Sequence, residues 1–149
     1  MRESNVPIYW DTLDSRTGYT TPMYPSLAIS AAASAFGRPV PLNGIWLYTV
    51  QIVIAGATAP VGTLVLQGSN DSLADPSSPL IKGTGVDNIP LASAMTWTDI
   101  AASSVAVAAN NNWTWNAADV GYEWVRAKWT YTSGSGGTVS GRIKLKGPA

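Results

Sequence analysis

The sequence predicts an all-β fold, a jelly-roll-type β-sandwich. From residue 45 onward, short stretches rich in β-branched and aromatic residues alternate with clusters of Gly, Pro, Ser and Asn. No stretch shows the sustained 3.6-residue period of a strongly amphipathic helix. The 149 residues fit one domain. We expect an extended, Pro-containing N-terminal arm over residues 1–44 and a β-sandwich domain over residues 45–149.

The arm is predicted from its prolines. Residues 1–44 hold half of the ten prolines in the chain and show no sustained periodicity. Proline fixes φ and has no N–H to donate, so it is rare inside sheets. Within this region the segment 26–36 is compatible with either a short helix or an apolar strand.

Two central strands are predicted next. In residues 45–55, "IWLYTVQIVIA", alternation places Trp46 and Ile52 with the other apolar residues on one face. The segment "GATAP" predicts a turn, and residues 61–71 predict a second strand. A loop rich in Gly, Ser, Asp and Pro follows, and then short strands at 95–100 and 104–109.

A closing hairpin is predicted over residues 121–147, with its turn in the Gly- and Ser-rich centre. Alternation places Val125, Ala127, Trp129 and Tyr131 on an apolar face. The opposite face then gathers five cations, Arg126, Lys128, Arg142, Lys144 and Lys146, at cross-strand spacings of about 5 Å. This basic face suits an acidic protein partner, and protection of a sheet edge by charge explains it equally well.

Four short motifs resemble a known class of proteins. In order they are "QGSND", "WTDI", "GYEWVRAKWT" and the Gly-rich "SGSGGTVSGRIKL". This order is similar to small β-sandwich virion structural proteins of tailed bacteriophages, of the capsid decoration or cement type, and covers roughly residues 45–146. The resemblance implies a structural role in the virion, at the head, neck or tail, and implies no activity.

Composition excludes several function classes. The chain has no cysteine and no histidine, which removes thiolate chemistry, the commonest general base and the commonest transition-metal ligand. No cofactor is expected. The formal net charge of zero argues against nucleic-acid binding, and no apolar run is long enough to span a membrane. Charged residues make up only 12% of the chain, which favours a homo-oligomer.

The arm also carries a candidate binding segment. Ile8 and the aromatic residues Tyr9 and Trp10 stand together in an otherwise polar stretch, which suits anchoring on a neighbouring protein. The alternative is that they fold back onto their own sandwich.

Two weaker candidates remain. Trp113 and Trp115 would share one strand face and form a stacking platform for a sugar, or serve as core residues. Asn70, Asp71, Asp75 and Asp87 offer oxygen ligands for calcium, but match no EF-hand and suit turns equally well.

The sequence therefore predicts a non-enzymatic phage structural protein. It is expected to bind and stabilise the shell of major capsid protein, or to bind other virion proteins, and to reside in a virion assembled in the host cytoplasm. The alternatives are a neck or tail protein and a carbohydrate-binding module of a fiber or baseplate. No pair of carboxylates and no nucleophile motif indicates an enzyme.

Overall fold

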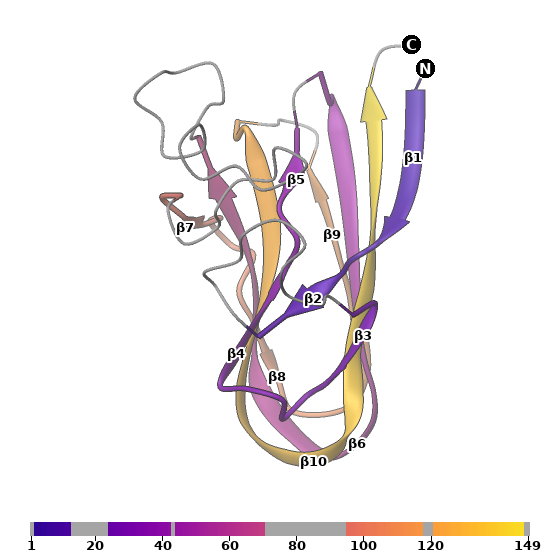
Figure 1. Cartoon of the computed structure of the whole chain (residues 1–149), viewed down its shortest axis with the longest axis vertical. Coiled ribbons are helices and arrows are strands. Elements are labelled where there is room, and N and C mark those ends of the chain that lie inside the picture. Colours follow the sequence, from indigo (N-terminus) through magenta and orange to yellow (C-terminus); the bar gives the residue numbers. More distant parts are fainter. Residues whose placement is uncertain (1, 13–23, 43, 71–94, 118–120, 148–149) are drawn as a thin grey trace.

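The computed structural model describes residues 2–12, 24–42, 44–70, 95–117 and 121–147 and confirms the all-β sandwich. Its frame is a pair of long strands, β6 (Leu47–Ser69) and β10 (Trp124–Gly147), which pair antiparallel along almost their whole lengths. Both strands turn back on themselves midway (Figure 1), so that each one contributes half of its length to either layer of the sandwich.

Glycines make this shared bend possible. Gly134 and Gly137 adopt φ values of +114° and +73°, which favour glycine, and the β6–β10 register shifts between Tyr131 and Ser135. A Cβ on Gly137 would lie 2.5 Å from the backbone nitrogen of Ala57, and one on Gly134 2.8 Å from Cα of Pro60. The two strands are therefore packed backbone against backbone where they fold.

Two expectations are corrected by this bend. The segment "GATAP" is not a turn between strands, because β6 continues through it. Residues 121–147 are not a hairpin, because the Gly-rich centre bends one continuous strand whose two halves each pair with β6. The alternation of apolar and polar residues is the same in a hairpin and in a bent strand. The two structures differ in the strand with which each half pairs, which the alternation does not report.

We call the layer that holds both chain ends sheet 1. It contains the first half of β6 and the second half of β10, with β9 on one side and β1 and β3 on the other. The bounds of the added strands are β1 (Arg2–Pro7), β3 (Ser26–Ala28) and β9 (Asn111–Ala117).

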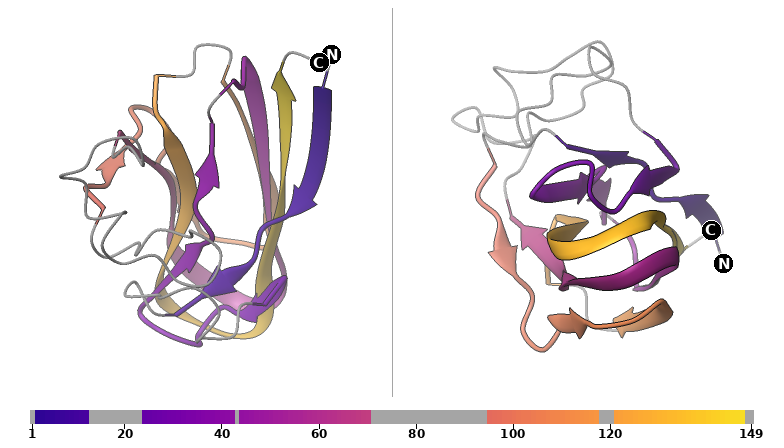
Figure 2. Two further views of the ribbon diagram at one scale, coloured as in Figure 1. Left: turned by 45° about the horizontal axis from the view of Figure 1, so that its top comes forward. Right: turned by 90° about the horizontal axis from the view of Figure 1, so that it is seen from below.

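Sheet 2 is the opposite layer. It contains the second half of β6 and the first half of β10, with β7 and β8 on one side and β4, β5 and β2 on the other. The bounds are β2 (Trp10–Asp11), β4 (Ser34–Gly37), β5 (Val40–Pro41), β7 (Thr98–Asp99) and β8 (Val105–Val107). Figure 2 shows both layers joined at the bend.

The core lies between the sheets. Trp129 is fully buried and donates its Nε1–H to the carbonyl of Ile29 at 2.9 Å. Gly62 makes room for this indole, since a Cβ there would lie 2.3 Å from the ring. The apolar faces predicted for residues 45–55 and for 125–131 point into this core, apart from two members. Trp46 is 55% exposed at the start of the strand, and Tyr131 is only half-buried.

The expected arm is built into both sheets over its described residues. β1, β3 and β5 pair with β10, and β2 pairs with β4, so the prediction of an arm separate from the sandwich is corrected. The segment 26–36 is neither a helix nor one strand: it contains β3, a turn and the start of β4. The arm prolines that the structure describes, Pro7, Pro25, Pro39 and Pro41, lie at strand ends or between strands, where no ladder N–H is lost.

Candidate docking face

The outer surface of sheet 1 is rich in polar side chains, and we call it the polar face. Strand register places alternate residues of β9, β6, β10 and β1 side by side on it. Row by row, Thr114, Gln51 and Arg142 lie together, and so do Asn116, Thr49, Lys144 and Asn5. Its polar members are Glu3, Asn5, Thr49, Gln51, Asn112, Thr114, Asn116, Thr138, Ser140, Arg142, Lys144 and Lys146.

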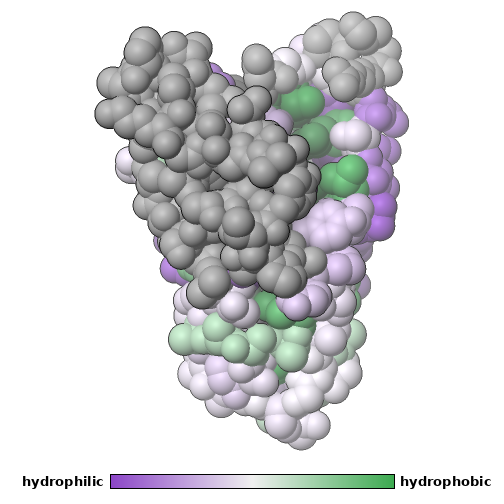
Figure 3. All heavy atoms as spheres, in the orientation of Figure 1, coloured by the Kyte–Doolittle hydropathy of each residue, from purple (hydrophilic) through white to green (hydrophobic). Residues whose placement is uncertain are grey.

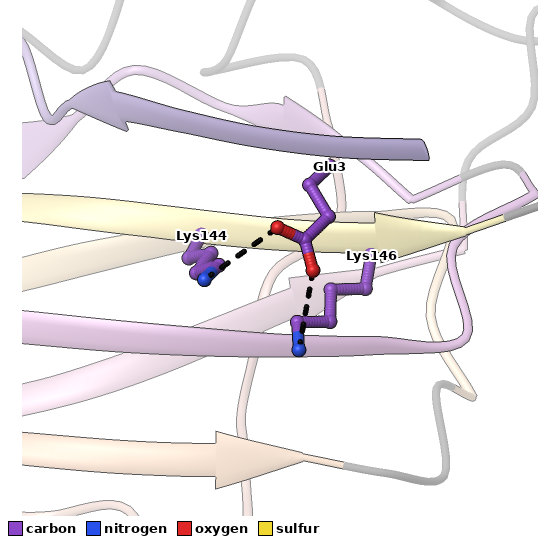
Figure 4. Close-up of polar contacts among 3 residues, drawn as sticks. All are labelled: Glu3, Lys144 and Lys146. Carbon is purple, nitrogen blue, oxygen red and sulfur yellow. Dashed lines mark ion pairs between the residues drawn. The ribbon is translucent and has the colours of Figure 1, made fainter. Parts of the chain in front are cut away.

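Glu3 joins the basic end of this face. Its two carboxylate oxygens lie 3.7 Å from the Lys144 ammonium and 3.3 Å from that of Lys146 (Figure 4). A hydrogen bond from Lys146, with the charges of both lysines, lowers the pKa of the Glu3 carboxyl. Both ion pairs are exposed to solvent, so salt screens them and they contribute little to stability. The two ion pairs help to position β1 but add little to the stability of the fold.

Arg142 is fixed by β1 as well. Its Nε donates to Oδ1 of Asn5 at 3.0 Å, and its terminal NH2 group donates to the backbone oxygen of Asn5 at 3.1 Å. One row further, the Thr49 hydroxyl donates to Oδ1 of Asn116 at 2.8 Å. The polar side chains are therefore partly pre-ordered, and three cations face one carboxylate on this surface. Figure 3 shows hydrophilic residues along the margin where β1 and β10 run.

The predicted basic face is divided by the bend. Arg142, Lys144 and Lys146 lie on the outer surface of sheet 1, whereas Arg126 and Lys128 lie on the outer surface of sheet 2. A single five-cation surface is therefore a wrong expectation. The reason is geometric: the two halves of β10 are in opposite layers, so their outward faces point away from each other.

Arg126 is a structural residue in this arrangement. Its side chain is 4% exposed, and its guanidinium carbon lies 4.4 Å from the ring centroid of Phe36 and 4.2 Å from that of Trp97. Its Nε donates to Gln67, whose Nε2 donates in turn to Asp99, both at 2.9 Å. Lys128 is half-buried, with its ammonium 5.6 Å from the Phe36 centroid.

This network explains the motifs that carried the resemblance. "QGSND" supplies Gln67, "WTDI" supplies Trp97 and Asp99, and "GYEWVRAKWT" supplies Arg126. Residues far apart in the chain thus meet in one cluster, in which Arg126 and Gln67 are buried, Trp97 is half-buried and Asp99 is exposed. The cluster was not predicted from the sequence, although the order of the motifs was the signal for it. Its contacts are those of a structural clasp, in which Arg126 is buried and Asp99 is exposed at the margin.

The sugar platform is not formed as expected. Trp113 and Trp115 share one face, as predicted, but that face is the inner one, where both rings pack against the core. Trp115 also donates its Nε1–H to the backbone oxygen of Ser103 at 2.9 Å. The alternative expectation, that they are core residues, describes them better, and both retain partial exposure beside the open edge of β9.

Two of the three candidate residues in the arm are likewise directed inward. Ile8 and Trp10 are buried in the chain's own core, which corrects their expected role as exposed anchors, and Tyr9 alone of the three is exposed, at 38%. In the expected calcium loop, Asn70 accepts a hydrogen bond from the backbone of Glu123. Asp71, Asp75 and Asp87 lie outside the described residues.

Within the described ranges no group of acidic residues is arranged to hold a metal ion, and no helix suited to crossing a membrane is found.

Two solved structures show a distant likeness to this chain. No protein-family model matches the chain, and no curated protein matches it significantly. One similar solved structure is a carbohydrate-binding module, described as "CBM4 structure and function", with 15% identity, a TM-score of 0.40, and coverage of 76% of this chain and 71% of the other. Another is the K1 cleaved adhesin domain of Lys-gingipain from Porphyromonas gingivalis, with 9% identity, a TM-score of 0.36, and coverage of 99% and 91%. Neither likeness is close enough to assign a function.

Proposed function

We propose that this protein is a non-enzymatic structural protein of a phage virion that docks on an acidic protein surface through the polar face of sheet 1. The observation that carries the proposal is the group of Arg142, Lys144 and Lys146, which contact β1 on a four-stranded surface, with Arg142 and Lys144 exposed and Lys146 half-buried. The order of the sequence motifs points to the virion, and the shell of major capsid protein is the partner proposed.

The character of the face suits a protein partner. Amide and hydroxyl groups surround the cations, and they can both donate to and accept from a polar partner surface. Register places no aromatic side chain among the described residues of this face, so it offers no stacking surface for a sugar ring. On the opposite surface of the sandwich, Arg126 is buried and Lys128 is half-buried.

The mechanism proposed is additive burial. Each copy that covers a seam of the shell contributes one modest interface, and binding to the assembled state alone stabilises that state by mass action. Electrostatic attraction then sets the association rate and its dependence on salt more than the final affinity.

The proposal is tested by measuring binding to empty capsids, assembled from the major capsid protein of the same phage, at low and high salt. We expect binding that weakens as salt rises, because exposed charges are screened beyond about 10 Å at 0.1 M ionic strength. A protein that ignores capsids at every salt concentration, and binds a glycan instead, would overturn it.

A further inference from the structure

The outer edge of β9 is an unprotected sheet edge. β9 pairs with β6 on one side, and among the described residues no strand pairs with its other side. In the right-hand view of Figure 2, β8 and β9 form the margin of the molecule. Exposed edges in native proteins are usually shortened or protected by charge or proline, because their free N–H and C=O groups pair with other chains.

The other described edges carry such protection. β1 contains Glu3 and Pro7, and β2, β7 and β8 are only two or three residues long. β9 has seven residues and contains neither charge nor proline, and residues 100–118 include no charged residue at all. β9 is therefore the one described edge that is both long and uncharged.

The backbone of β9 offers hydrogen-bonding groups along this edge. The N–H of Asn112 donates to the side-chain Oδ1 of Asn111 at 2.8 Å rather than to β6, so it points to the open side. In an antiparallel ladder the backbone groups of every second residue point the same way. The N–H and C=O groups of Thr114 and Asn116 are therefore directed at the open edge too.

The sequence of β9 is symmetric about Thr114. It reads Asn-Trp-Thr-Trp-Asn over residues 112–116, the same in both directions. In an antiparallel pair centred on Thr114, Asn112 would lie opposite the partner's Asn116, and Trp113 opposite the partner's Trp115. Thr–Thr and aromatic–aromatic pairs are among the favourable cross-strand neighbours, and a two-fold interface requires this kind of self-complementarity.

We propose that β9 is the self-association edge of this protein, where two copies pair β9 to β9 around a two-fold axis at Thr114 and join their first sheets into one. The remaining exposed parts of Trp113 and Trp115 are covered by the partner's indoles. The polar faces of both copies then lie on the same side of the joined sheet. This inference concerns an edge rather than the polar face, and it stands independently of capsid docking.

Cysteine cross-linking tests the register, because the chain has no cysteine of its own. Thr114 lies on the proposed axis, so its two copies are opposed with Cα atoms about 5 Å apart, within disulfide range. Residue 112 lies opposite the partner's residue 116, so the two copies of residue 112 are offset by four residues along the paired strands. Their Cα atoms are then about 14 Å apart, which is too far for a disulfide.

We expect T114C to form a covalent dimer under mild oxidant, whereas N112C and N116C do not when each is alone. A mixture of N112C and N116C should cross-link. The proposal is overturned if T114C cross-links no faster than N112C, or if the mixture fails.

Light scattering on the full chain gives a second, non-covalent readout. The wild-type protein should reach about twice its 15.6 kDa mass as concentration rises. T114K and T114E each place like charges opposite one another at the axis, and each should weaken association tenfold or more. Their equimolar mixture should restore the dimer.

The matched control is A55K, which adds the same charge to an exposed residue of the same sheet one strand inward. Its mass should follow the wild type, and all variants should melt near the wild-type temperature because both side chains are exposed. A wild-type protein that stays monomeric at every concentration, or a T114K variant with wild-type mass, contradicts the inference.

Discussion

Trp129 shows how much one side chain contributes to this fold. Its indole is fully buried between the sheets, occupies the space left by Gly62, and donates a hydrogen bond to the backbone of Ile29. It thereby ties sheet 2 to the segment that follows β3 in sheet 1. A buried tryptophan usually has a hydrogen-bond acceptor for its indole N–H, as Trp129 has here.

Replacing Trp129 should separate these two contributions. W129A is expected to lose about 3–5 kcal/mol of unfolding free energy through the cavity. W129F keeps most of the ring but leaves the Ile29 carbonyl without its donor, and should lose about 1–3 kcal/mol. Urea unfolding measures both. A W129F protein as stable as the wild type would contradict the role given to the hydrogen bond, and equal losses for the two variants would contradict the role given to the packing of the ring.

Glu3 makes β1 sensitive to pH. The Lys146 hydrogen bond and both lysine charges lower the pKa of Glu3 below its usual 4.5 in the folded state. A lowered folded pKa means that the contribution is present above pH 4.5 and is lost as the pH falls through the folded value. Hydrogen exchange of the β1 amides should therefore accelerate at low pH in the wild type.

The control for this prediction is E3Q, which cannot titrate. Its β1 amides should exchange faster than the wild type at neutral pH and lack the additional acceleration at low pH, after correction for intrinsic exchange rates. An identical pH profile in both proteins would show that Glu3 does not control β1.

At the scale of elements, the bend in β6 and β10 decides the architecture. Gly136 and Gly137 both adopt positive φ, at +62° and +73°, but their surroundings differ. A Cβ on Gly136 would lie 3.6 Å from the nearest oxygen, whereas one on Gly137 would lie 2.5 Å from the backbone of Ala57. Close packing therefore constrains only the second of these two glycines.

This contrast predicts unequal costs for the same substitution. G136A should lose about 1–2 kcal/mol, the cost of left-handed backbone for a residue with a Cβ. G137A adds a clash with the backbone of β6 and should lose clearly more. Thermal and urea unfolding compare the two variants, and a G137A protein as stable as G136A would contradict the close approach at the bend.

The elements also show what sequence reasoning can and cannot reach. Alternation over residues 45–55 predicted the buried positions of Tyr48, Val50, Ile52 and Ile54, because period-two patterns report directly on burial. The same alternation could not tell a hairpin from a bent strand in residues 124–147. The prediction of a hairpin paired the two halves of β10 with each other instead of with β6, and it therefore placed all five cations on one surface.

The predictions for the site failed where a side chain is buried although the composition of its segment suggested that it is exposed. Ile8 and Trp10 lie in a polar, proline-containing segment, which suggested exposed anchors, yet they fill the core. Proline between short strands is compatible with pairing when no ladder N–H is required at that residue. Arg126 was predicted to be a surface cation, but it is buried. Its contacts with the rings of Phe36 and Trp97 and its hydrogen bond to Gln67 replace the interactions with water that a buried charge loses.

At the scale of the whole molecule, the two outer surfaces of the sandwich have different roles. The surface of sheet 2 has buried polar and aromatic groups, with Arg126 at their centre. The surface of sheet 1 is exposed and carries three cations that β1 positions. Among the residues that the structure describes, three cations thus lie together on the outer surface of sheet 1.

This division predicts opposite outcomes for variants of the two halves of β10. R142Q/K144Q/K146Q removes two exposed cations and the half-buried Lys146. It should keep a melting temperature close to that of the wild type while losing capsid binding. R126M removes the buried clasp. It should lower stability by about 2–4 kcal/mol and leave the docking surface of the remaining folded protein unchanged.

The most direct test of the account is the affinity of the protein for empty capsids across a salt series, measured for the wild type, R142Q/K144Q/K146Q and E3Q. We predict that the triple variant loses most of the low-salt affinity, and that E3Q binds more tightly because Lys144 and Lys146 are freed from their carboxylate. We also predict that the three proteins converge at high salt. Equal affinities for all three proteins at low salt would show that the polar face of sheet 1 is not the docking surface.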